Sequence, residues 1–297
     1  MDRVDCNSLN LELTRVCNLK CIHCLRGDSQ NEFMDIHTIE QIFSNFGRIN
    51  KLLLTGGEPL LAVEQISRII EIIKRDGIEV DTVKIITNGT VLGEKQIELL
   101  DSLGEISNNL LIGISGDKFH LMEIERMGLS TLRDKNISIL KELYGALELK
   151  DYDSNQRVII RSVGRAQELT REDMYRINNV GKKTNYVLST DTRYSSYKSN
   201  VVRYKLPYYS EDSLINGDLN FDVHGNLLSA ANLSFDDEDK ESTTGVRNIK
   251  ITSLPKVIED VIRYGLLTDK EQGQIWREFY QKEVSHVKKL GKIKTEL

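Results

Sequence analysis

Short apolar runs alternate along the first two-thirds of the chain with segments whose apolar residues recur every three or four positions. Most of these runs are apolar at nearly every position, which is typical of parallel strands that are covered on both faces. The pattern predicts six strands, at residues 9–13, 52–55, 83–87, 110–115, 157–162 and 186–190.

Segments with helical spacing lie between the predicted strands. The first has one apolar face, formed by Ile39, Ile42, Phe43 and Phe46. Thr38 and Gln41 have the spacing of a capping box at the start of this helix. The apolar spacing recurs at residues 66–73 and 97–103. Strands that alternate with helices predict an α/β fold with a parallel sheet and right-handed crossovers.

The pattern changes after residue 190. Residues 219–230 predict two short strands that turn at Gly225 and Asn226, and the acidic segment 235–242 predicts a solvated loop. Further helices are expected at residues 253–266 and 269–290. We therefore expect an α/β domain, followed by a small α+β extension with a tyrosine-rich segment, a hairpin and helices; the two parts are residues 1–190 and 191–297.

The tyrosine-rich segment covers residues 186–209 and contains six tyrosines, interleaved with lysine and arginine. Aromatic and basic side chains together can stack on bases and bind phosphates, and they can equally line a peptide groove. We expect this segment to pack the extension against the first domain. Contact with a substrate is the alternative.

The composition argues against a nucleic-acid-binding, membrane or secreted protein. A formal net charge of −5 gives no broad electrostatic reason to expect a nucleic-acid partner. The chain lacks an apolar run near the roughly 20 residues that span a bilayer, and its start does not resemble a secretory signal. Three of its four cysteines are clustered, which in a reducing compartment indicates metal binding or catalysis and not a disulfide framework. We therefore expect a cytoplasmic protein without a membrane partner.

The unusual polar motifs all follow predicted strands. "CNLKCIHC" (17–24) follows the first strand and "GGEP" (56–59) follows the second. "TNG" (87–89) and "SGDKFH" (115–120) follow the third and fourth. Because ligands of parallel sheets and barrels bind at the carboxyl ends of the strands, these motifs predict one site on one rim.

The clustered thiols point to a metal. Thiolates bind zinc and iron–sulfur clusters, and structural zinc needs four closed ligands, usually as two separated pairs. Cysteine does not occur after Cys24, although His23 or Cys6 could complete a set of four. An iron–sulfur cube held by three thiolates instead leaves one iron open to another ligand. Both an open cluster and a non-catalytic zinc-binding interaction protein fit these residues.

The motifs resemble those of the radical S-adenosylmethionine (SAM) enzymes. "CNLKCIHC" has the CxxxCxxC spacing of that family, and "GGEPLL" (56–61) resembles its second signature. "ITNG" (86–89) and "GISGD" (113–117) resemble strand ends in the branch of peptide-modifying maturases with SPASM or twitch extensions. The resemblance covers roughly residues 8–190 and implies the family's partial (β/α)6 TIM-like barrel.

The resemblance also implies the cofactors. One [4Fe–4S] cluster would be held by Cys17, Cys21 and Cys24, and its open iron would be chelated by the amino and carboxylate groups of S-adenosylmethionine. An electron from an external donor, such as flavodoxin or ferredoxin, would allow the reduced cluster to cleave the sulfonium. The resulting 5′-deoxyadenosyl radical would abstract a hydrogen atom from the substrate.

The "GGEP" turn is expected to bind S-adenosylmethionine. By resemblance, Glu58 would hold the methionine ammonium, and Pro59 would rigidify the turn. Gly56 and Gly57 would allow a close backbone approach that a Cβ would obstruct. Taken alone, such a turn is also an ordinary structural feature.

Other family positions on the rim are expected to contact S-adenosylmethionine as well. His23 would lie near the adenine, while Asn88, Ser115 and Asp117 would contact the ribose or the methionine end. Arg161, on the fifth strand, would pair with the carboxylate. Ser115 and Asp117 could equally cap the segment that follows them.

The chain departs from the maturase branch in its extension. Residues 223–235 and 245–249 resemble the hairpin and the Gly-Asn-Ile portion of the extension that carries auxiliary clusters. Where cysteines are expected, this chain has Ser229, Ala230 and Asn232. We therefore predict a single cluster. Cys6, upstream of the first strand, is expected to be a fortuitous free thiol, and a role as hydrogen-atom donor is the alternative.

These observations predict a radical SAM enzyme that abstracts a hydrogen atom from a peptide and causes epimerisation or cross-linking. A nucleoside or small metabolite is the alternative substrate. The zinc-binding interaction protein is the alternative of another class.

Overall fold

The computed structural model describes nine stretches of the chain, residues 3–145, 148–150, 157–161, 164–179, 185–189, 208–209, 214–228, 233–243 and 248–260.

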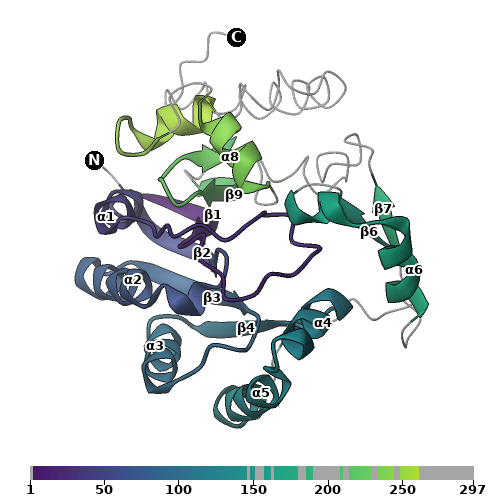
Figure 1. Ribbon diagram of the computed structural model, residues 1–297. Coiled ribbons are helices and arrows are strands. Elements are labelled where there is room, and N and C mark those ends of the chain that lie inside the picture. Colours follow the sequence, from purple (N-terminus) through teal and green to yellow (C-terminus); the bar gives the residue numbers. More distant parts are fainter. Residues whose placement is uncertain are drawn as a thin grey trace.

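The fold is built on one mixed sheet in which the long strands are parallel (Figure 1). The order across the sheet is β10-β9-β1-β2-β3-β4-β5, and β8 pairs with β9. Its first five strands are β1 (Val4–Glu12), β2 (Phe46–Thr55), β3 (Glu79–Thr87), β4 (Asn109–Ser115) and β5 (Glu148–Lys150). The later strands are β8 (Tyr208–Tyr209), β9 (Leu214–Phe221) and β10 (Leu227–Leu228). Within the described residues the order does not return to its start, so the sheet is open.

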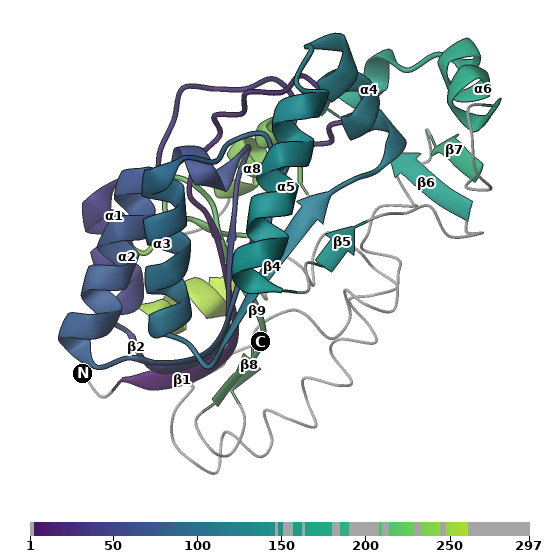
Figure 2. The same ribbon diagram turned by 90° about the horizontal axis from the view of Figure 1, so that it is seen from below.

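Helices cover one face of this sheet. Figures 1 and 2 show α1, α2, α3 and α5 side by side along the strands. The helices of the first half are α1 (Ile36–Phe43), α2 (Val63–Asp76), α3 (Glu94–Glu105), α4 (Lys118–Arg126) and α5 (Ser130–Tyr144). The apolar faces of α1, α2, α3 and α5 and the strands form one hydrophobic core, as the sequence periodicity predicts, whereas Ile124 of α4 packs with Leu19 and Cys21 of the loop after β1. The α/β class with an open parallel sheet, as in a partial TIM-like barrel, is thereby confirmed.

Two details of the first helix differ from the prediction. Phe46 is not helical, since it begins β2 and lies opposite Val4 of β1. The capping box is wrong, because Asp35 is the N-cap and Thr38 lies inside the helix. The Thr38 side chain is fully buried, and its hydroxyl has no hydrogen-bond partner. A capping side chain must instead lie at the end of the helix, where free backbone N–H groups remain.

The last two strands predicted for the first domain are present. They are β6 (Arg157–Arg161) and β7 (Asn185–Ser189), which pair in parallel with each other. Between them lie η2 (Gly164–Glu168) and α6 (Arg171–Asn179). Among the described residues, these two strands form a separate two-stranded sheet.

The predicted hairpin at residues 219–230 is confirmed as β9 and β10. Its turn contains Gly225, whose φ is +84° and whose hypothetical Cβ would lie 2.6 Å from Cγ2 of Thr38. The hairpin belongs to the main sheet, because β9 pairs in parallel with β1. The predicted boundary at residue 190 lies outside the described residues and stays a prediction.

The acidic segment at residues 235–242 is a helix, α8 (Phe235–Ser242), and the predicted solvated loop is wrong. The Ser234 hydroxyl accepts a hydrogen bond from the backbone N–H of Asp237, as a helix cap does. Phe235 and Glu238 are buried, so one face of this acidic helix is not solvated. Residues 254–260 are helical as predicted, whereas 269–290 lie outside the described residues.

Within the part of the chain that the structure describes, none of the helices is both long enough and apolar enough to cross a membrane.

The pairing of β9 with β1 includes a buried side-chain contact whose contribution to stability can be measured. Asn10 of β1 donates a hydrogen bond to the Asn220 carboxamide oxygen of β9 at 2.7 Å, and both side chains are buried. Asn10→Ala leaves that oxygen unpaired, so we expect the free energy of unfolding to fall by about 1–3 kcal/mol. A double-mutant cycle with Asn220→Ala, measured by urea unfolding, should give a coupling of about 0.5–3 kcal/mol.

Asn50→Ala is the matched control. Asn50 donates to the Asn7 side chain at 3.0 Å near the surface, between β1 and β2. Its removal should change stability by less than about 0.5 kcal/mol. Additive effects of Asn10→Ala and Asn220→Ala would contradict the contact.

Candidate functional site

The three clustered cysteines lie in one irregular segment between β1 and α1, which we call the cysteine loop (residues 13–33). Cys17, Cys21 and Cys24 line one pocket and carry free thiols. The same pocket is lined by residues from the carboxyl ends of the first four strands, namely Glu12, Thr55, Asn88 and Ser115. The structure therefore brings the predicted rim motifs together.

The Gly-Gly-Glu turn is seated directly on the cysteine loop. The Gly57 N–H donates to the Thr14 carbonyl at 2.7 Å, and the Glu58 N–H donates to the Val16 carbonyl at 2.8 Å. A Cβ on Gly57 would lie 2.3 Å from the Val16 oxygen, and one on Gly56 would lie equally close to the Thr14 oxygen. The close approach that these glycines allow here is to the chain's own cysteine loop.

Glu58 connects the ends of β2 and β3. Its carboxylate accepts hydrogen bonds from the backbone N–H of Leu60 at 3.1 Å and of Asn88 at 2.8 Å. Burial raises the pKa of Glu58 to about 7, even though these hydrogen bonds act in the opposite direction. Pro59 begins a short 3₁₀ helix, η1 (Pro59–Leu61), that fixes the turn after Glu58.

Asn88 links the end of β3 to the cysteine loop. Its side-chain amide donates to the Asn18 carboxamide oxygen at 2.9 Å, and its own oxygen accepts from the Thr90 hydroxyl at 2.6 Å. From α5, the buried Arg133 donates to the carbonyls of Asn88 at 3.2 Å and Ser115 at 2.9 Å. Arg133 thus fixes the ends of β3 and β4 together.

Asp117 organises the loop after β4. It is the N-cap of α4 and accepts from the backbone N–H groups of Phe119 and His120, each at 3.1 Å. His120 Nδ1 lies 2.6 Å from its carboxylate, and His23 Nε2 lies 3.4 Å from it. Burial alone would raise the pKa of Asp117, but the bonds from His120 and His23 outweigh it and hold the pKa far below its usual range.

His23 and His120 lie on the same side of the pocket as Cys21. The His23 ring stacks on Phe119, with ring centroids 4.5 Å apart. Ligand atoms of Cys21, His23 and His120 lie within 4.8 Å of one another, so these three side chains could hold a metal ion. His120 is not among the residues that the sequence predicts for the site, and its spacing of three residues from the N-cap Asp117 is the local signal that could indicate it.

A segment distant in the sequence, η2 (Gly164–Glu168), also contacts the cysteine loop. The Arg165 N–H donates to the Cys24 carbonyl at 3.0 Å, and the Arg165 guanidinium Nε donates to the Cys21 carbonyl at 3.1 Å. Gly164, with φ +55°, allows this contact, since its Cβ would lie 2.4 Å from the Leu25 oxygen. Arg165 lines the pocket, whereas the side chain of Arg161 lies outside the described residues.

Comparison with known proteins identifies this arrangement. Residues 11–145 match the family model of the radical SAM superfamily. This part of the chain is therefore a radical SAM domain. Members of this superfamily are enzymes, and the matched residues contain the cysteine loop and the Gly-Gly-Glu turn.

The relatives of known sequence include both named enzymes and proteins without a named activity. The chain is 34% identical over 151 residues to a GTP 3′,8-cyclase of Clostridium perfringens, covering 48% of this chain and 44% of that one. It is 30% identical over 149 residues to an uncharacterised protein of Methanocaldococcus jannaschii, covering 49% of each. The chain spans about half the length, or less, of these relatives. Among solved structures, Streptococcus suis SuiB is 13% identical, with a TM-score of 0.47 over 87% of this chain and 66% of that one.

The thiols of this radical SAM domain suit an iron–sulfur cluster. Three of them face one pocket, and none is in a disulfide. Burial raises the pKa of Cys17 to about 11, so this thiol is protonated at neutral pH when no metal is bound. Metal binding therefore has to displace protons from these cysteines.

The other predicted residues are distributed as follows. Cys6 is fully buried in the hydrophobic core, and it lies six residues before Glu12 on β1, a separation of about 20 Å along the strand. It is not among the residues that line the pocket. The candidate positions of the missing cysteines, residues 229–232, lie outside the described residues, as does most of the tyrosine-rich segment.

The contact between the turn and the cysteine loop can be tested with Gly57→Ala. We expect this substitution to destabilise the protein by about 1–3 kcal/mol, because the new Cβ meets the Val16 carbonyl. It should also lower the amount of iron bound after anaerobic reconstitution. Gly104→Ala is the control, since Gly104 lies in α3 and its Cβ would meet nothing closer than 3.9 Å. Equal iron contents and thermal stabilities for the two variants would argue against the contact.

The raised pKa of Glu58 predicts a pH dependence of stability. The pKa of Glu58 is about 7 in the folded protein, compared with 4.5 for an ordinary glutamate. The folded state therefore holds this proton more tightly than the unfolded state. The resulting stability is present below pH 4.5 and is lost as the pH rises through 7. Relative to Glu58→Gln, the metal-free wild type should lose up to about 3 kcal/mol between pH 5 and pH 8. A difference in urea unfolding that stays constant over this range would show that Glu58 titrates normally.

Proposed function

We propose that the pocket holds one [4Fe–4S] cluster on Cys17, Cys21 and Cys24 with S-adenosylmethionine beside it, and that the enzyme acts on a peptide. The observation that carries this proposal is the Gly-Gly-Glu turn, which two backbone hydrogen bonds seat on the cysteine loop. When bound, the reduced cluster and S-adenosylmethionine supply a 5′-deoxyadenosyl radical that abstracts a substrate hydrogen atom.

The chain's own residues supply binding and orientation. Glu58 is a buried carboxylate at the pocket, so a methionine ammonium beside it would be paired and would favour the ionised form of Glu58. Asn88 and Ser115 line the same wall from the ends of β3 and β4. We propose that they contact S-adenosylmethionine, and that Asp117 acts by positioning His23 and His120.

Arg165 is the residue that we propose for the carboxylate of S-adenosylmethionine, in addition to the Arg161 expected from the sequence. Its guanidinium lines the pocket and is held by the Cys21 carbonyl, close to the predicted cluster ligands. Its ion-pair partner, Asp28, lies 3.4 Å away and is 88% exposed, so solvent weakens that pairing.

The lining of the pocket favours a peptide over a nucleotide. The extension contributes Asn220, Phe221, Leu228 and Phe235, which offer amide and apolar contacts. The two other arginines of the lining, Arg15 and Arg26, are each paired with buried carboxylates, so neither is available to a phosphate group. The Ile249 N–H donates to the Gly225 carbonyl at 3.0 Å, and the two segments that resemble the maturase extension therefore pack together.

A nucleotide is the second candidate substrate. It is favoured by the similarity of the radical SAM domain to proteins named GTP 3′,8-cyclases. The two candidates separate in one assay, in which S-adenosylmethionine turnover is measured with GTP and with candidate peptides. We propose a flavodoxin or a ferredoxin as the electron donor in either case, and the cytoplasm as the compartment.

The cluster assignment can be tested with the four cysteines. Alanine substitution of Cys17, Cys21 or Cys24 should abolish iron binding and the formation of 5′-deoxyadenosine after reduction with dithionite. Cys6→Ala is the matched control and should retain both, because Cys6 lies in the core. If Cys6 donates a hydrogen atom, its variant would still cleave S-adenosylmethionine and would change only the product. Absence of 5′-deoxyadenosine from reconstituted wild-type protein would refute the proposed function.

Metal analysis tests the alternative of another class. A colourless protein with one zinc ion and no iron or sulfide would support a zinc site at Cys21, His23 and His120. Radical SAM membership and the three pocket-facing thiols instead favour a brown iron–sulfur protein.

A further inference from the structure

Two arginines bracket the clustered cysteines. Arg15 lies two residues before Cys17, and Arg26 lies two residues after Cys24. The Arg15 side chain is 1% exposed and the Arg26 side chain is 17% exposed, although both belong to an irregular loop. Guanidinium groups are this strongly buried only where they are paired.

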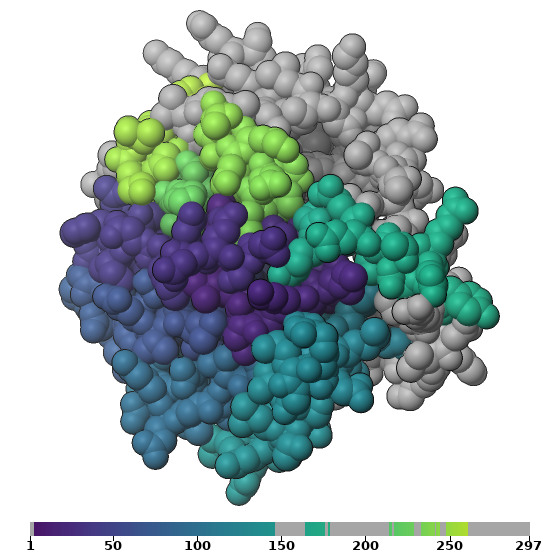
Figure 3. All heavy atoms as spheres, in the orientation of Figure 1, coloured from purple at the N-terminus to yellow at the C-terminus, as the bar shows by residue number. Residues whose placement is uncertain are grey.

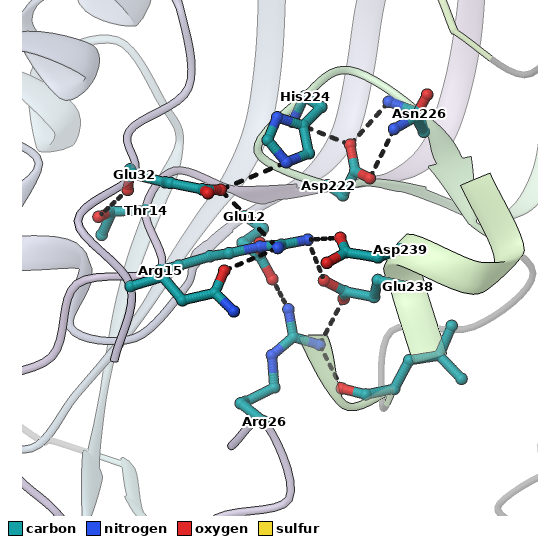
Figure 4. A network of polar contacts seen from close by, with 12 residues as sticks. Glu12, Thr14, Arg15, Arg26, Glu32, Asp222, His224, Asn226, Glu238 and Asp239 are labelled. Atoms are coloured by element: carbon teal, nitrogen blue, oxygen red, sulfur yellow. Dashed lines mark hydrogen bonds and ion pairs between the residues drawn. The ribbon is translucent and has the colours of Figure 1, made fainter. Parts of the chain in front are cut away.

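Both arginines pair with the same two carboxylates, as Figure 4 shows. Glu12, at the end of β1, lies 3.1 Å from Arg15 Nε and also pairs with Arg26. Glu238, on α8, lies 3.3 Å from Arg15 Nη2 and 2.6 Å from Arg26 Nη1. The four side chains therefore form a closed ring of alternating charge, with one carboxylate from β1 and one from α8.

Helix α8 makes further contacts with the same two arginines. The Phe235 ring lies under both guanidinium groups, at 4.8 Å from Arg15 Cζ and 4.9 Å from Arg26 Cζ. The Phe235 N–H donates to the Arg26 carbonyl at 2.9 Å, and Arg26 Nη1 donates to the Leu233 carbonyl at 2.7 Å. Asp239 adds an ion pair with Arg15 Nη2 at 2.9 Å.

These contacts tie together the two ends of the segment that contains the cysteines. Figure 3 shows the purple cysteine loop lying against the green C-terminal segment of the molecule. Glu12, Arg15, Arg26, Phe235 and Glu238 also line the pocket, so the ring of charges lies next to the three thiols. Removing one member of a buried ion pair leaves its partners uncompensated and is strongly unfavourable.

We propose that α8 is a positioning element for the cluster, and that Glu238 and Phe235 are its positioning residues. They hold Arg15 and Arg26, and through them the two ends of the cysteine segment, at the separation that three thiolate ligands of one cluster require. The C-terminal extension thus completes the cluster site without supplying a ligand to it. This inference rests on the proposed function, because it requires a cluster on Cys17, Cys21 and Cys24.

Glu238→Gln tests the inference with little change in shape. The full-length protein is reconstituted anaerobically, and the loss of iron to a chelator is followed together with the electron paramagnetic resonance spectrum of the reduced cluster. Because residues that support metal ligands typically contribute this much, the chelator concentration for half removal should fall roughly 10- to 100-fold. The response of the spectrum to S-adenosylmethionine should also change, which a role in overall stability alone would not cause.

Asp236→Asn is the matched control, since Asp236 is an exposed acidic residue on the same helix. It should retain iron and the spectrum of the wild type. Phe235→Leu provides a second variant, in which all charges remain and the ring under the guanidinium groups is lost. If Glu238→Gln does not fold, this variant should show the same weaker retention of iron.

The outcomes separate this inference from the proposed function. Wild-type protein that binds no iron–sulfur cluster contradicts both. A wild-type cluster that Glu238→Gln and Phe235→Leu retain as tightly as Asp236→Asn contradicts the positioning role alone. Weaker retention in both variants, with the spectral change in Glu238→Gln, supports it.

Discussion

The cysteine loop depends on contacts made by other parts of the chain, since it contains neither a helix nor a strand of its own. The backbone N–H groups of Gly57 and Glu58 donate two hydrogen bonds to it, and the approach is so close that a Cβ on Gly56 or Gly57 would clash with the loop. Arg165 holds the carbonyls of Cys21 and Cys24. These contacts fix the backbone of the loop from both sides, so three thiols separated by short spacings face one pocket. The two signature motifs of the radical SAM domain are therefore in direct contact, and the Gly-Gly-Glu turn fixes the backbone of the loop that carries the three cysteines.

The C-terminal extension is part of the same structure. β9 adds a parallel strand beside β1, and α8 covers the cysteine loop with a buried ring of two arginines and two glutamates. In the maturase branch that the sequence resembles, the extension carries additional clusters, whereas this chain has no cysteine beyond Cys24. Charge pairing and a phenylalanine ring connect the extension to the site here. The same contacts account for an acidic helix whose Glu238 is buried.

The parallel strands and the position of the site could be predicted from the sequence, because they depend on local periodicity and on the topology of parallel sheets. Continuous apolar runs identify buried parallel strands, and the rule that ligands lie at their carboxyl ends placed four motifs on one rim. What the sequence could not show depends on partners distant in the chain. Residues 235–242 were expected to be a solvated loop, because nothing in "FDDEDKES" indicates that Glu238 meets Arg15 and Arg26, more than two hundred residues away. Arg133 and Arg165 were likewise missed, since each acts on backbone carbonyls that only the folded chain brings within reach.

In the site proposed here, three thiols and no fourth side chain hold one cluster, which leaves an iron open at the pocket. Electron paramagnetic resonance of the anaerobically reconstituted and reduced protein, recorded before and after addition of S-adenosylmethionine, tests this most directly. We expect about four iron atoms per chain, as one [4Fe–4S] cluster contains, and a spectrum that changes when S-adenosylmethionine binds the open iron. A spectrum that does not respond to S-adenosylmethionine, or a protein that binds zinc in place of iron, would contradict it.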